Sequence, residues 1–272
     1  MIRAPAITGA TELLAILGDP IAHASSPALA NERLEARGVD ARLVPWHVSA
    51  ADLPRAVDAL RGIRNLRGAI VTMPHKIAVV RHLDRVLSLA ASVGAVNVVR
   101  RTADGRLEGT NLDGEGFAAG LLSAGHTLAG RRVLLAGAGG AAVAIAFALA
   151  QRAVASISIH NRTIAAAFAL AGRLRQAFPA LPVDVRSAPD ASDADLVVNA
   201  TSLGMHAGDA LPVDVTTVSP GALVAEVVIT PQQTALLRAA AERGCATHPG
   251  RPMLLAQIDL MLDFMLTDDG VS

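Results

Sequence analysis

One short segment constrains the fold of this chain more than any other: the glycine-rich stretch 131–142, Arg-Arg-Val-Leu-Leu-Ala-Gly-Ala-Gly-Gly-Ala-Ala. An apolar run that ends in Gly-x-Gly-x-x-Ala is typical of a buried strand turning directly into a helix. Gly137 permits the tight turn, Gly139 lets the backbone approach phosphate groups, and Ala142 leaves room for helix–strand packing. The N–H groups at the helix start then face an anion. The turn predicts a Rossmann-type dinucleotide site, although similar turns also occur without a ligand.

The next predicted strand, 155–160, indicates which dinucleotide would bind. An NAD-specific site usually carries an acid at this strand end, which accepts a hydrogen bond from the ribose 2′-hydroxyl. Here the strand is followed by Asn161, Arg162 and Thr163, with no acid. A guanidinium has a permanent charge and forked donors, which suit a 2′-phosphate. We therefore predict NADP(H) over NAD(H), the alternative being an ordinary surface arginine after a strand.

Composition narrows the class of protein. A length of 272 residues suggests about two domains, and 52% hydrophobic residues can fill sizeable cores. Lys plus Arg and Asp plus Glu balance at 24 each, so nothing attracts nucleic acid or an anionic membrane surface. The first residues lack a signal-peptide core, and no uninterrupted membrane span is seen. Cys245 is the single cysteine, which excludes an internal disulfide and fits a reducing cytoplasm. No Cys/His cluster has metal-ligand spacing, so no metal site is expected.

Strands and helices alternate along the chain, which predicts an α/β fold with mostly parallel sheets. The hairpin pattern at 103–105 and the cap Ser26, with proline in the first helical turn, support the assignment locally. The expected strands are 12–17, 42–48, 68–72, 97–101, 106–108, one beginning near 133, 155–160, 183–186, 195–199 and 223–228. The expected helices include 27–37, 53–60, 76–90, 113–123, 232–243 and 253–266.

Two residues are candidates for proton transfer, which hydride chemistry at an alcohol or ketone requires. Lys76 lies at the mouth of the predicted helix 76–90, where the helix dipole would disfavour its ammonium form. Asp113, in Gly-Thr-Asn-Leu-Asp-Gly, lies at the expected seam between two domains. Taken singly, a loop lysine is usually solvated and Asp-Gly is usually a turn.

Together with other motifs, these segments resemble the shikimate dehydrogenase family, including its quinate-using and shikimate dehydrogenase-like branches. The matching stretches are in family order and at family-like spacing. They are 18–23 with Ser26-Pro27, 71–76, 94–97, 111–114, 137–141, 161–163, 199–202 and 253–257.

The resemblance implies two domains: an N-terminal α/β substrate-binding catalytic domain, 1–112 plus 251–272, and a Rossmann NADP-binding domain, 113–250. The C-terminal helix would return to the first domain. Lys76 and Asp113 would be the catalytic pair. The resemblance implies substrate contacts by Ser26, Thr72, Asn97 and Gln257, and cofactor contacts by Gly137, Ala138, Gly139, Gly140, Ala141, Asn161, Arg162, Thr163 and Thr201.

The implied activity is NADP(H)-dependent interconversion of a ring hydroxyl and a ketone in shikimate and 3-dehydroshikimate, or in a related cyclic hydroxy acid. A cytoplasmic monomer or homodimer of the shikimate pathway, which leads to aromatic amino acids, is expected.

Departures from the family pattern leave the substrate open. Ala24, Ile70 and Ile229 stand where polar residues are expected, Ala166 replaces a second basic residue, and Pro252 replaces a glycine. His23, His75 or Arg251 could hold an acid instead, or be solvated loop residues. The alternatives are a paralogue acting on quinate, an aminated analogue or another hydroxy acid, and a catalytically weak nucleotide-binding regulatory protein. The presence of both Lys76 and Asp113 argues against the last.

Overall fold

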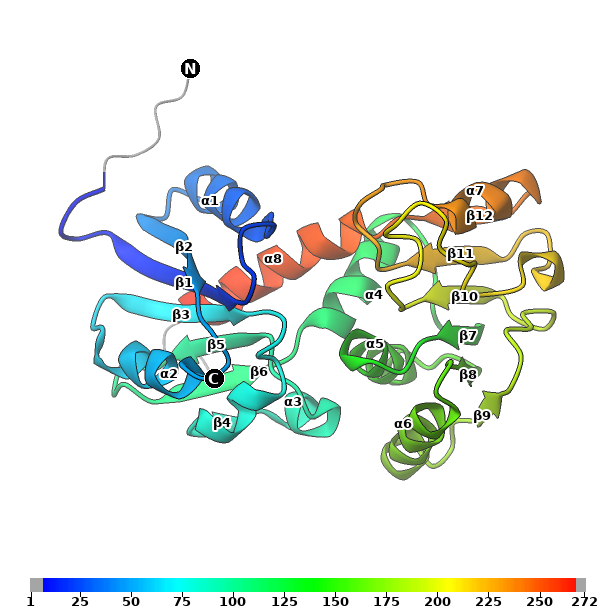
Figure 1. The fold of residues 1–272 in the computed structure, drawn as a ribbon, viewed down its shortest axis with the longest axis horizontal. Helices are drawn as coiled ribbons and strands as arrows, with labels where there is room; N and C mark the ends of the chain where they lie inside the picture. Colours follow the sequence, from blue (N-terminus) through cyan, green and yellow to red (C-terminus); the bar gives the residue numbers. More distant parts are fainter. Residues whose placement is uncertain (1–6, 268–272) are drawn as a thin grey trace, which may run out of the picture. The chain divides into compact units, whose positions relative to one another are not determined.

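The computed structural model describes residues 7–267, which divide into two compact units (Figure 1). Residues up to 112 and from 258 onward form the first unit, and 113–257 form the second. The sequence places residues 251–257 with the first unit, whereas in the structure they belong to the second. The reason is close packing, since a Cβ on Gly120 would lie only 3.0 Å from the Met253 nitrogen.

The first unit contains six strands and three complete α-helices. The strands are β1 (Glu12–Gly18), β2 (Ala41–His47), β3 (Leu66–Val71), β4 (Arg85–Val86), β5 (Val98–Arg101) and β6 (Leu107–Thr110). The helices are α1 (Ser26–Ala36), α2 (Leu53–Gly62), α3 (Ser88–Val93) and the later part of α8 (Arg251–Leu266), with a 3₁₀ helix at Ala78–His82.

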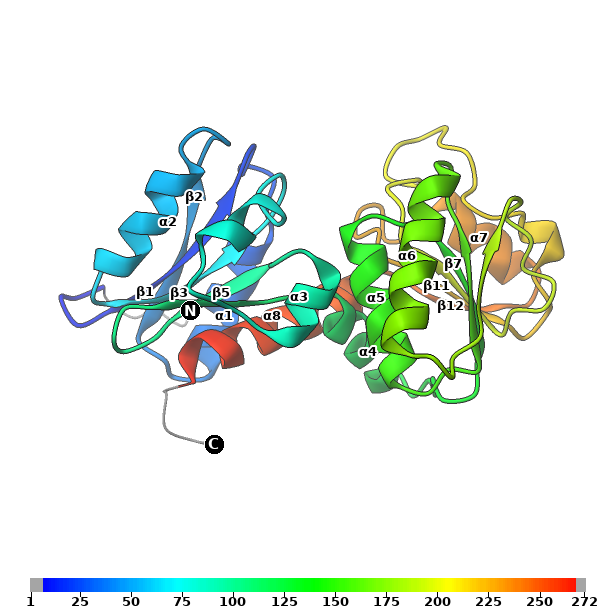
Figure 2. The same cartoon turned by 90° about the horizontal axis from the view of Figure 1, so that it is seen from below.

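The sheet of the first unit is mixed, in the order β2-β1-β3-β5-β6-β4. Strands β1, β2 and β3 are parallel, whereas β5 is antiparallel to β3 and β6. Helix α2 covers one face and joins its core through Leu53 and Val57. On the other face, Arg37 of α1 donates hydrogen bonds to Asp259 and Asp263 of α8 at 2.8 and 2.6 Å. The sheet is thus covered on both sides (Figure 2).

The second unit contains six strands and helices that alternate with them. The strands are β7 (Arg132–Ala136), β8 (Ser156–His160), β9 (Val183–Arg186), β10 (Leu196–Asn199), β11 (Leu223–Glu226) and β12 (Ala246–His248). The helices are α4 (Asp113–Ser123), α5 (Gly140–Gln151), α6 (Ile164–Ala177), α7 (Ala235–Glu242) and the first turns of α8, with a 3₁₀ helix at Val215–Thr217.

The sheet of the second unit is wholly parallel, in the order β12-β11-β10-β7-β8-β9. Helices α5 and α6 lie on one face and α7 on the other (Figure 2). The strand order reverses between β7 and β10, and in such sheets ligands bind outside the carboxyl ends of the strands at this point. The predicted α/β fold with a Rossmann-type unit is therefore confirmed.

The expected helix 76–90 is wrong. The chain forms turns, the 3₁₀ helix, strand β4 and helix α3 instead. Asp84 explains the difference, because its backbone N–H donates to the Leu107 carbonyl at 3.0 Å and its carboxylate accepts from the Leu107 N–H at 2.8 Å. These bonds draw the chain into pairing with β6. The short strands β4 and β12 were not expected from the sequence, since two or three residues carry no visible alternation.

Two further observations concern expectations made from the sequence. The N-cap of α1 is Ser25, not Ser26, and its side chain makes no capping hydrogen bond. Within residues 7–267, no helix is long and apolar enough to cross a membrane.

Candidate functional site

The glycine turn after β7 forms as predicted, and its glycines have two different structural reasons. Gly137 has a φ of +117°, and a Cβ there would lie 2.9 Å from the Ala200 carbonyl oxygen. Conformation and space therefore both require glycine at this position. A Cβ on Gly139 or Gly140 would meet no protein atom within 4 Å. Protein packing does not explain these two glycines, whereas a ligand lying directly against the backbone does.

The start of α5 offers donors to such a ligand. Gly139 is the N-cap residue, and no side chain caps the helix. The first N–H groups of a helix have no intrahelical acceptor, and together with the helix dipole they favour an anion. The residues at this turn therefore fit the pyrophosphate of a dinucleotide.

A pocket of about 290 Å³ opens beside the turn, where three neighbouring strands of the second unit end. Among the residues that the structure describes, the exposed Arg162 makes no hydrogen bond or ion pair, so its charge is not neutralised by the protein. The lining residues include no Asp or Glu that could accept a ribose hydroxyl. They are Ala136, Gly137, His160, Asn161, Arg162, Thr163, Pro189, Thr201, Ser202, Leu203, Leu211 and Pro212.

Thr201 lines this pocket from the loop after β10, but its hydroxyl is used inside the loop. The hydroxyl donates to Asn199 Oδ1 at 2.7 Å and accepts the Leu203 N–H at 3.0 Å. Its backbone N–H also donates to Asn199 Oδ1, at 3.0 Å. Asn199 therefore sets the shape of the loop that forms one wall of the pocket.

Asp113 and Gln257, which the sequence places far apart, come together in the second unit. Gln257 Nε2 donates a hydrogen bond to Asp113 Oδ1, and the two residues are 9% and 4% exposed. Glycines on α4 allow this approach, because a Cβ on Gly116 would lie 2.7 Å from the Gln257 Cβ. On another side of α4, Gly114 contacts the backbone of Ala144 in α5. The carboxylate is thus held in a buried position by close helix packing.

In the first unit, Lys76 lies in the loop after β3, and hydrogen bonds to other segments fix this loop. The Thr72 N–H donates to the Leu17 carbonyl at 2.9 Å, and the Val96 N–H donates to the Lys76 carbonyl at 2.8 Å. His75 is 1% exposed, and its Nε2 hydrogen-bonds the Val48 carbonyl at 2.7 Å. His75 therefore anchors the loop and is not available to hold a substrate acid.

The helix-dipole argument for Lys76 loses its basis, because no long helix begins there. A five-residue 3₁₀ helix at Ala78–His82 follows instead. Such a helix carries little of the aligned dipole of a long α-helix. Any role of Lys76 as a proton donor must rest on its position.

Asn97 connects the Lys76 loop to the end of the first unit. It is fully buried, its carbonyl accepts the Val71 N–H at 2.8 Å, and its Oδ1 accepts the Leu112 N–H at 2.9 Å. Leu112 directly precedes Asp113 in the chain. Asn97 therefore fixes the backbone at the point where the second unit begins.

The predicted substrate-binding serine lies at the start of α1. Ser26 is its first residue, and neither Ser25 nor Ser26 uses its hydroxyl in a hydrogen bond within the described part of the chain. Of the departures, Ile70 is a core residue of β3 at 4% exposure, whereas Ile229 is 37% exposed in the loop after β11. The apolar substitution at 229 thus faces solvent.

Comparisons with known proteins show the family of the chain. The model of the shikimate dehydrogenase substrate binding domain matches residues 16–99, and that of shikimate / quinate 5-dehydrogenase matches 121–206. A shikimate dehydrogenase (NADP(+)) from Rubrobacter xylanophilus is 42% identical over 260 residues, which cover 93% of this chain and 90% of that protein. The chain belongs to the shikimate dehydrogenase family.

Two solved structures of this family's fold are similar over nearly their whole length. One is shikimate 5-dehydrogenase from Listeria monocytogenes in complex with shikimate and NAD, with a TM-score of 0.89, 33% identity and coverage of 95% of this chain and 93% of that chain. The other is ligand-free 5-ketofructose reductase of Gluconobacter sp., with a TM-score of 0.87, 33% identity and coverage of 94% and 93%.

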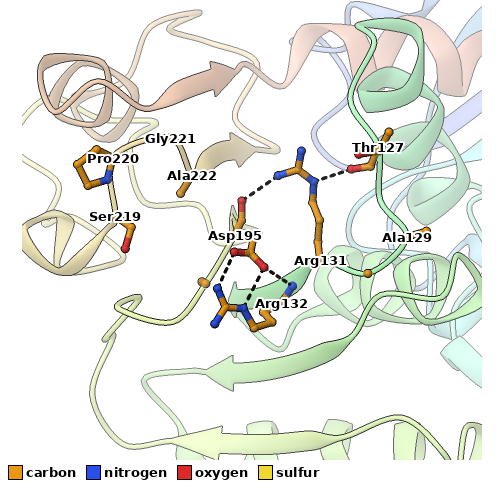
Figure 3. Close-up of a pocket in the computed structure, with 11 residues that line it drawn as sticks. Thr127, Ala129, Arg131, Arg132, Asp195, Ser219, Pro220, Gly221 and Ala222 are labelled. Atoms are coloured by element: carbon orange, nitrogen blue, oxygen red, sulfur yellow. Dashed lines mark hydrogen bonds and ion pairs between the residues drawn. The ribbon is translucent and has the colours of Figure 1, made fainter.

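A larger pocket, of about 460 Å³, lies elsewhere in the second unit (Figure 3). It is at the amino ends of β7, β10 and β11, the edge opposite the glycine turn. Arg132 donates to both carboxylate oxygens of Asp195, at 2.7 and 3.0 Å, and lowers the pKa of that carboxyl to about 2. Arg131 donates to the Asp195 carbonyl at 3.1 Å. The charged groups of this larger pocket have partners, and the pocket lies at the edge of the sheet opposite the glycine turn. The volume of a pocket therefore does not by itself identify the nucleotide site.

Sequence reasoning missed some residues of the candidate site. Pro189, Leu211 and Pro212 line the nucleotide pocket from loops that carry no motif. The glycines at 114, 116 and 120 were visible in the sequence, and a glycine-rich helix could have indicated close packing on two sides. Among residues 7–267, no three His, Cys, Asp or Glu side chains gather to hold a metal ion.

Proposed function

We propose that this protein is an NADP(H)-dependent oxidoreductase that interconverts a ring hydroxyl and a ketone of shikimate and 3-dehydroshikimate, or of a closely related cyclic hydroxy acid. The observation that carries the proposal is the buried Asp113 carboxylate hydrogen-bonded by Gln257. A carboxylate is costly to bury without charged or polar partners. Its burial in a chain of a dehydrogenase family, one residue after a backbone fixed by Asn97, supports a role in chemistry.

The nucleotide site belongs to the second unit. The backbone at Gly137, Ala138, Gly139, Gly140 and Ala141 holds the pyrophosphate, and Asn161, Arg162 and Thr163 hold the 2′-phosphate. Thr201, in the loop after β10, forms part of one wall of the nucleotide pocket. The Arg162 guanidinium, which has no partner in the described part of the chain, supports the choice of NADP(H), because hydrogen bonds to charged groups are worth about 1.5–3 kcal/mol each.

Bound NADP⁺ supplies the acceptor for the hydride that leaves the carbinol carbon. Lys76 Nζ takes the hydroxyl proton as the C–H bond breaks and the C=O bond forms. In the reverse direction the Lys76 ammonium gives this proton to the ketone oxygen. Asp113 is assigned the hydrogen bond to the reacting substrate oxygen. The proton and the hydride are thus both accounted for.

The first unit supplies most of the substrate contacts. Thr72 and Asn97 bind ring hydroxyls, as does Gln257 of the second unit, and Ser26, at the start of α1, binds the acid. Ser25 is adjacent, and its hydroxyl makes no hydrogen bond within residues 7–267, so it supports the acid in place of the hydroxyl that Ala24 lacks. We assign substrate binding to the first unit and dinucleotide binding to the second, in a cytoplasmic monomer or homodimer.

The experiment is NADP⁺ reduction followed by absorbance, with a panel containing shikimate, quinate, an aminated analogue and neutral polyols. We expect turnover of shikimate or one relative, and a loss of about 10²–10⁴-fold in kcat for Lys76→Ala. The Kd for NADP⁺, measured by calorimetry, should be the same in the wild-type protein and in Lys76→Ala. Wild-type protein that binds NADP⁺ but turns over no compound would favour a regulatory nucleotide-binding role.

A second candidate is a reductase of another hydroxy acid or of a neutral polyhydroxy ketone. Ala24 and the exposed Ile229 remove polar groups from the expected acid-binding end. Losing two or three bonds to one carboxylate, at about 1.5–3 kcal/mol each, would weaken shikimate binding by orders of magnitude. The similar structure named 5-ketofructose reductase supports substrates without an acid. Efficient turnover of shikimate at micromolar KM would rule this candidate out.

A further inference from the structure

A buried acid lies two strands away from the glycine turn and has no assigned role. The register of the parallel strands places Ala136, Asn199 and Glu226 side by side, because Ala136 pairs with Asn199 and Asn199 with Glu226. Asn199 and Glu226 are both fully buried. Glu226, the last residue of β11, is therefore level in the sheet with Ala136, and Gly137 begins the nucleotide turn directly after Ala136.

Glu226 contacts two loops at once. Its Oε2 accepts the Thr234 hydroxyl at 3.0 Å, and Asn199, its partner in the strand register, lies beside it. Asn199 in turn holds Thr201 and donates from Nδ2 to the Leu203 carbonyl at 3.0 Å. Thr201, Ser202 and Leu203 line the nucleotide pocket. A single carboxyl thus connects the pocket wall to the loop 227–234.

Packing reinforces this connection at the far end of the pocket loop. Gly204 has a φ of +103°, and a Cβ there would lie 3.2 Å from Thr234 Cγ2. Thr234 also caps α7, since its hydroxyl accepts the Leu237 N–H at 3.3 Å. The loop 200–204 therefore rests against the residue that Glu226 holds.

Stability alone does not explain an acid at this position. Within residues 7–267, Glu226 Oε1 has no hydrogen-bond partner and no ion pair to Glu226 is found. Burial raises the pKa of the carboxyl. An incompletely satisfied buried acid costs free energy, and an apolar side chain of similar size would be expected to stabilise the fold equally well. Such exceptions occur mainly where function requires them.

We propose that Glu226 is a positioning residue for the nucleotide site: through its hydrogen bond to Thr234 it holds the loops 200–204 and 227–234 in the arrangement that binds NADP(H). This inference rests on the proposed function, because it assumes that the pocket binds the dinucleotide. Glu226 itself does not line the pocket. Its effect on binding is therefore exerted through Thr234, which packs against Gly204 at the end of the pocket loop.

The test compares Glu226→Met with Glu226→Gln by calorimetric titration with NADP⁺ and by thermal unfolding. Met fills the volume but does not replace the carboxylate acceptor, whereas Gln keeps one oxygen that accepts the Thr234 hydroxyl. We expect Glu226→Met to raise the Kd for NADP⁺ about tenfold without lowering Tm, and Glu226→Gln to stay within about twofold of wild type. Thr234→Val should raise Kd in the same direction, and Glu226→Met with Thr234→Val should add little further, since both act through one connection.

Each result decides the inference. A Glu226→Met protein with unchanged Kd overturns it, whether or not Tm falls, because a structural role lowers Tm and leaves the folded protein's affinity intact. A Glu226→Gln protein as weak as Glu226→Met also overturns it. Wild-type protein that binds no NADP⁺ overturns the proposed function and this inference together. Wild-type binding with the expected difference between Met and Gln supports both.

Discussion

Candidate site residues follow the carboxyl ends of strands in both sheets, but their positions are set in different ways in the two units. In the second unit, Gly137 and Arg162 directly follow β7 and β8, and short strand–helix turns set their positions. In the first unit, Lys76 lies in a loop fixed by hydrogen bonds to Leu17 and Val96, which belong to other segments. Local sequence therefore specifies the nucleotide edge, whereas tertiary contacts specify the Lys76 edge. A site built from tertiary contacts tolerates substitutions such as Ala24 without losing its framework.

The largest effect is expected for a substitution of Asp113. Asp113→Asn keeps an oxygen that accepts the Gln257 hydrogen bond but removes the charge. We expect kcat to fall about 10²–10⁴-fold, with NADP⁺ binding unchanged, because the carboxylate is proposed to hydrogen-bond the reacting substrate oxygen. Steady-state rates and calorimetry on the same preparation measure the two quantities.

Glu115→Gln is the matched control on the same helix. Glu115 forms an ion pair with Arg152 at 2.6 Å, and both side chains are about one-quarter exposed. Its removal should change kcat less than about twofold and stability by about 0–1 kcal/mol. Equal losses of rate in both variants would mean that α4 has been disturbed generally, and Asp113 would lose its assigned role.

Two glycines in the same turn distinguish a glycine that the fold requires from one that a ligand would require. Gly137→Val places a β-branched residue at a φ of +117° and 2.9 Å from a carbonyl oxygen, so the free energy of unfolding should fall by about 2–4 kcal/mol. Gly139→Ala meets no protein atom within 4 Å, so stability should stay within about 0.5 kcal/mol while NADP⁺ binding weakens. Urea unfolding and calorimetry test both. If Gly139→Ala binds NADP⁺ normally, the backbone does not approach the phosphates.

The same difference explains how much could be predicted from the sequence. The strands at β7 and β8, the helix at α4 and the hairpin around Gly105 follow local patterns and are confirmed. The segment 76–90 was wrong because Asp84 bonds to Leu107, which lies on another strand. The contact between Asp113 and Gln257 has no local pattern at all. Residue types at the candidate site were therefore predictable, but the contacts that hold them were not.

A substitution of Arg162 tests whether this residue binds the 2′-phosphate, as the sequence pattern after β8 predicts. Arg162→Ala should raise the Kd for NADP⁺ by about tenfold to 150-fold, which corresponds to about 1.5–3 kcal/mol for hydrogen bonds to a charged phosphate. Affinity for NAD⁺, titrated into the same variant, should not change because NAD⁺ has no 2′-phosphate. Tm should also be unchanged, since this exposed side chain has no partner within the described residues. Equal weakening of both nucleotides would assign Arg162 to a different part of the cofactor.

The smallest expected effect comes from a tertiary contact in the second unit that no motif marks. The ring of His248, which is 4% exposed, lies edge-on to that of His126 at 5.7 Å between centroids. Burial and the neighbouring His126 lower the pKa of His248. The folded state therefore favours neutral His248 relative to the unfolded chain, whose histidine pKa is about 6.5.

Because the folded pKa is the lower one, this contribution to stability is present above about pH 6.5 and is lost as the pH falls below it. One proton gives a slope of at most about 1.4 kcal/mol per pH unit. Urea unfolding between about pH 8 and 5.5 should show a flatter dependence for His248→Gln than for wild type. Identical slopes in His248→Gln and wild type would mean that His248 is equally easy to protonate in both states, and that the second unit owes less to tertiary burial than its structure indicates.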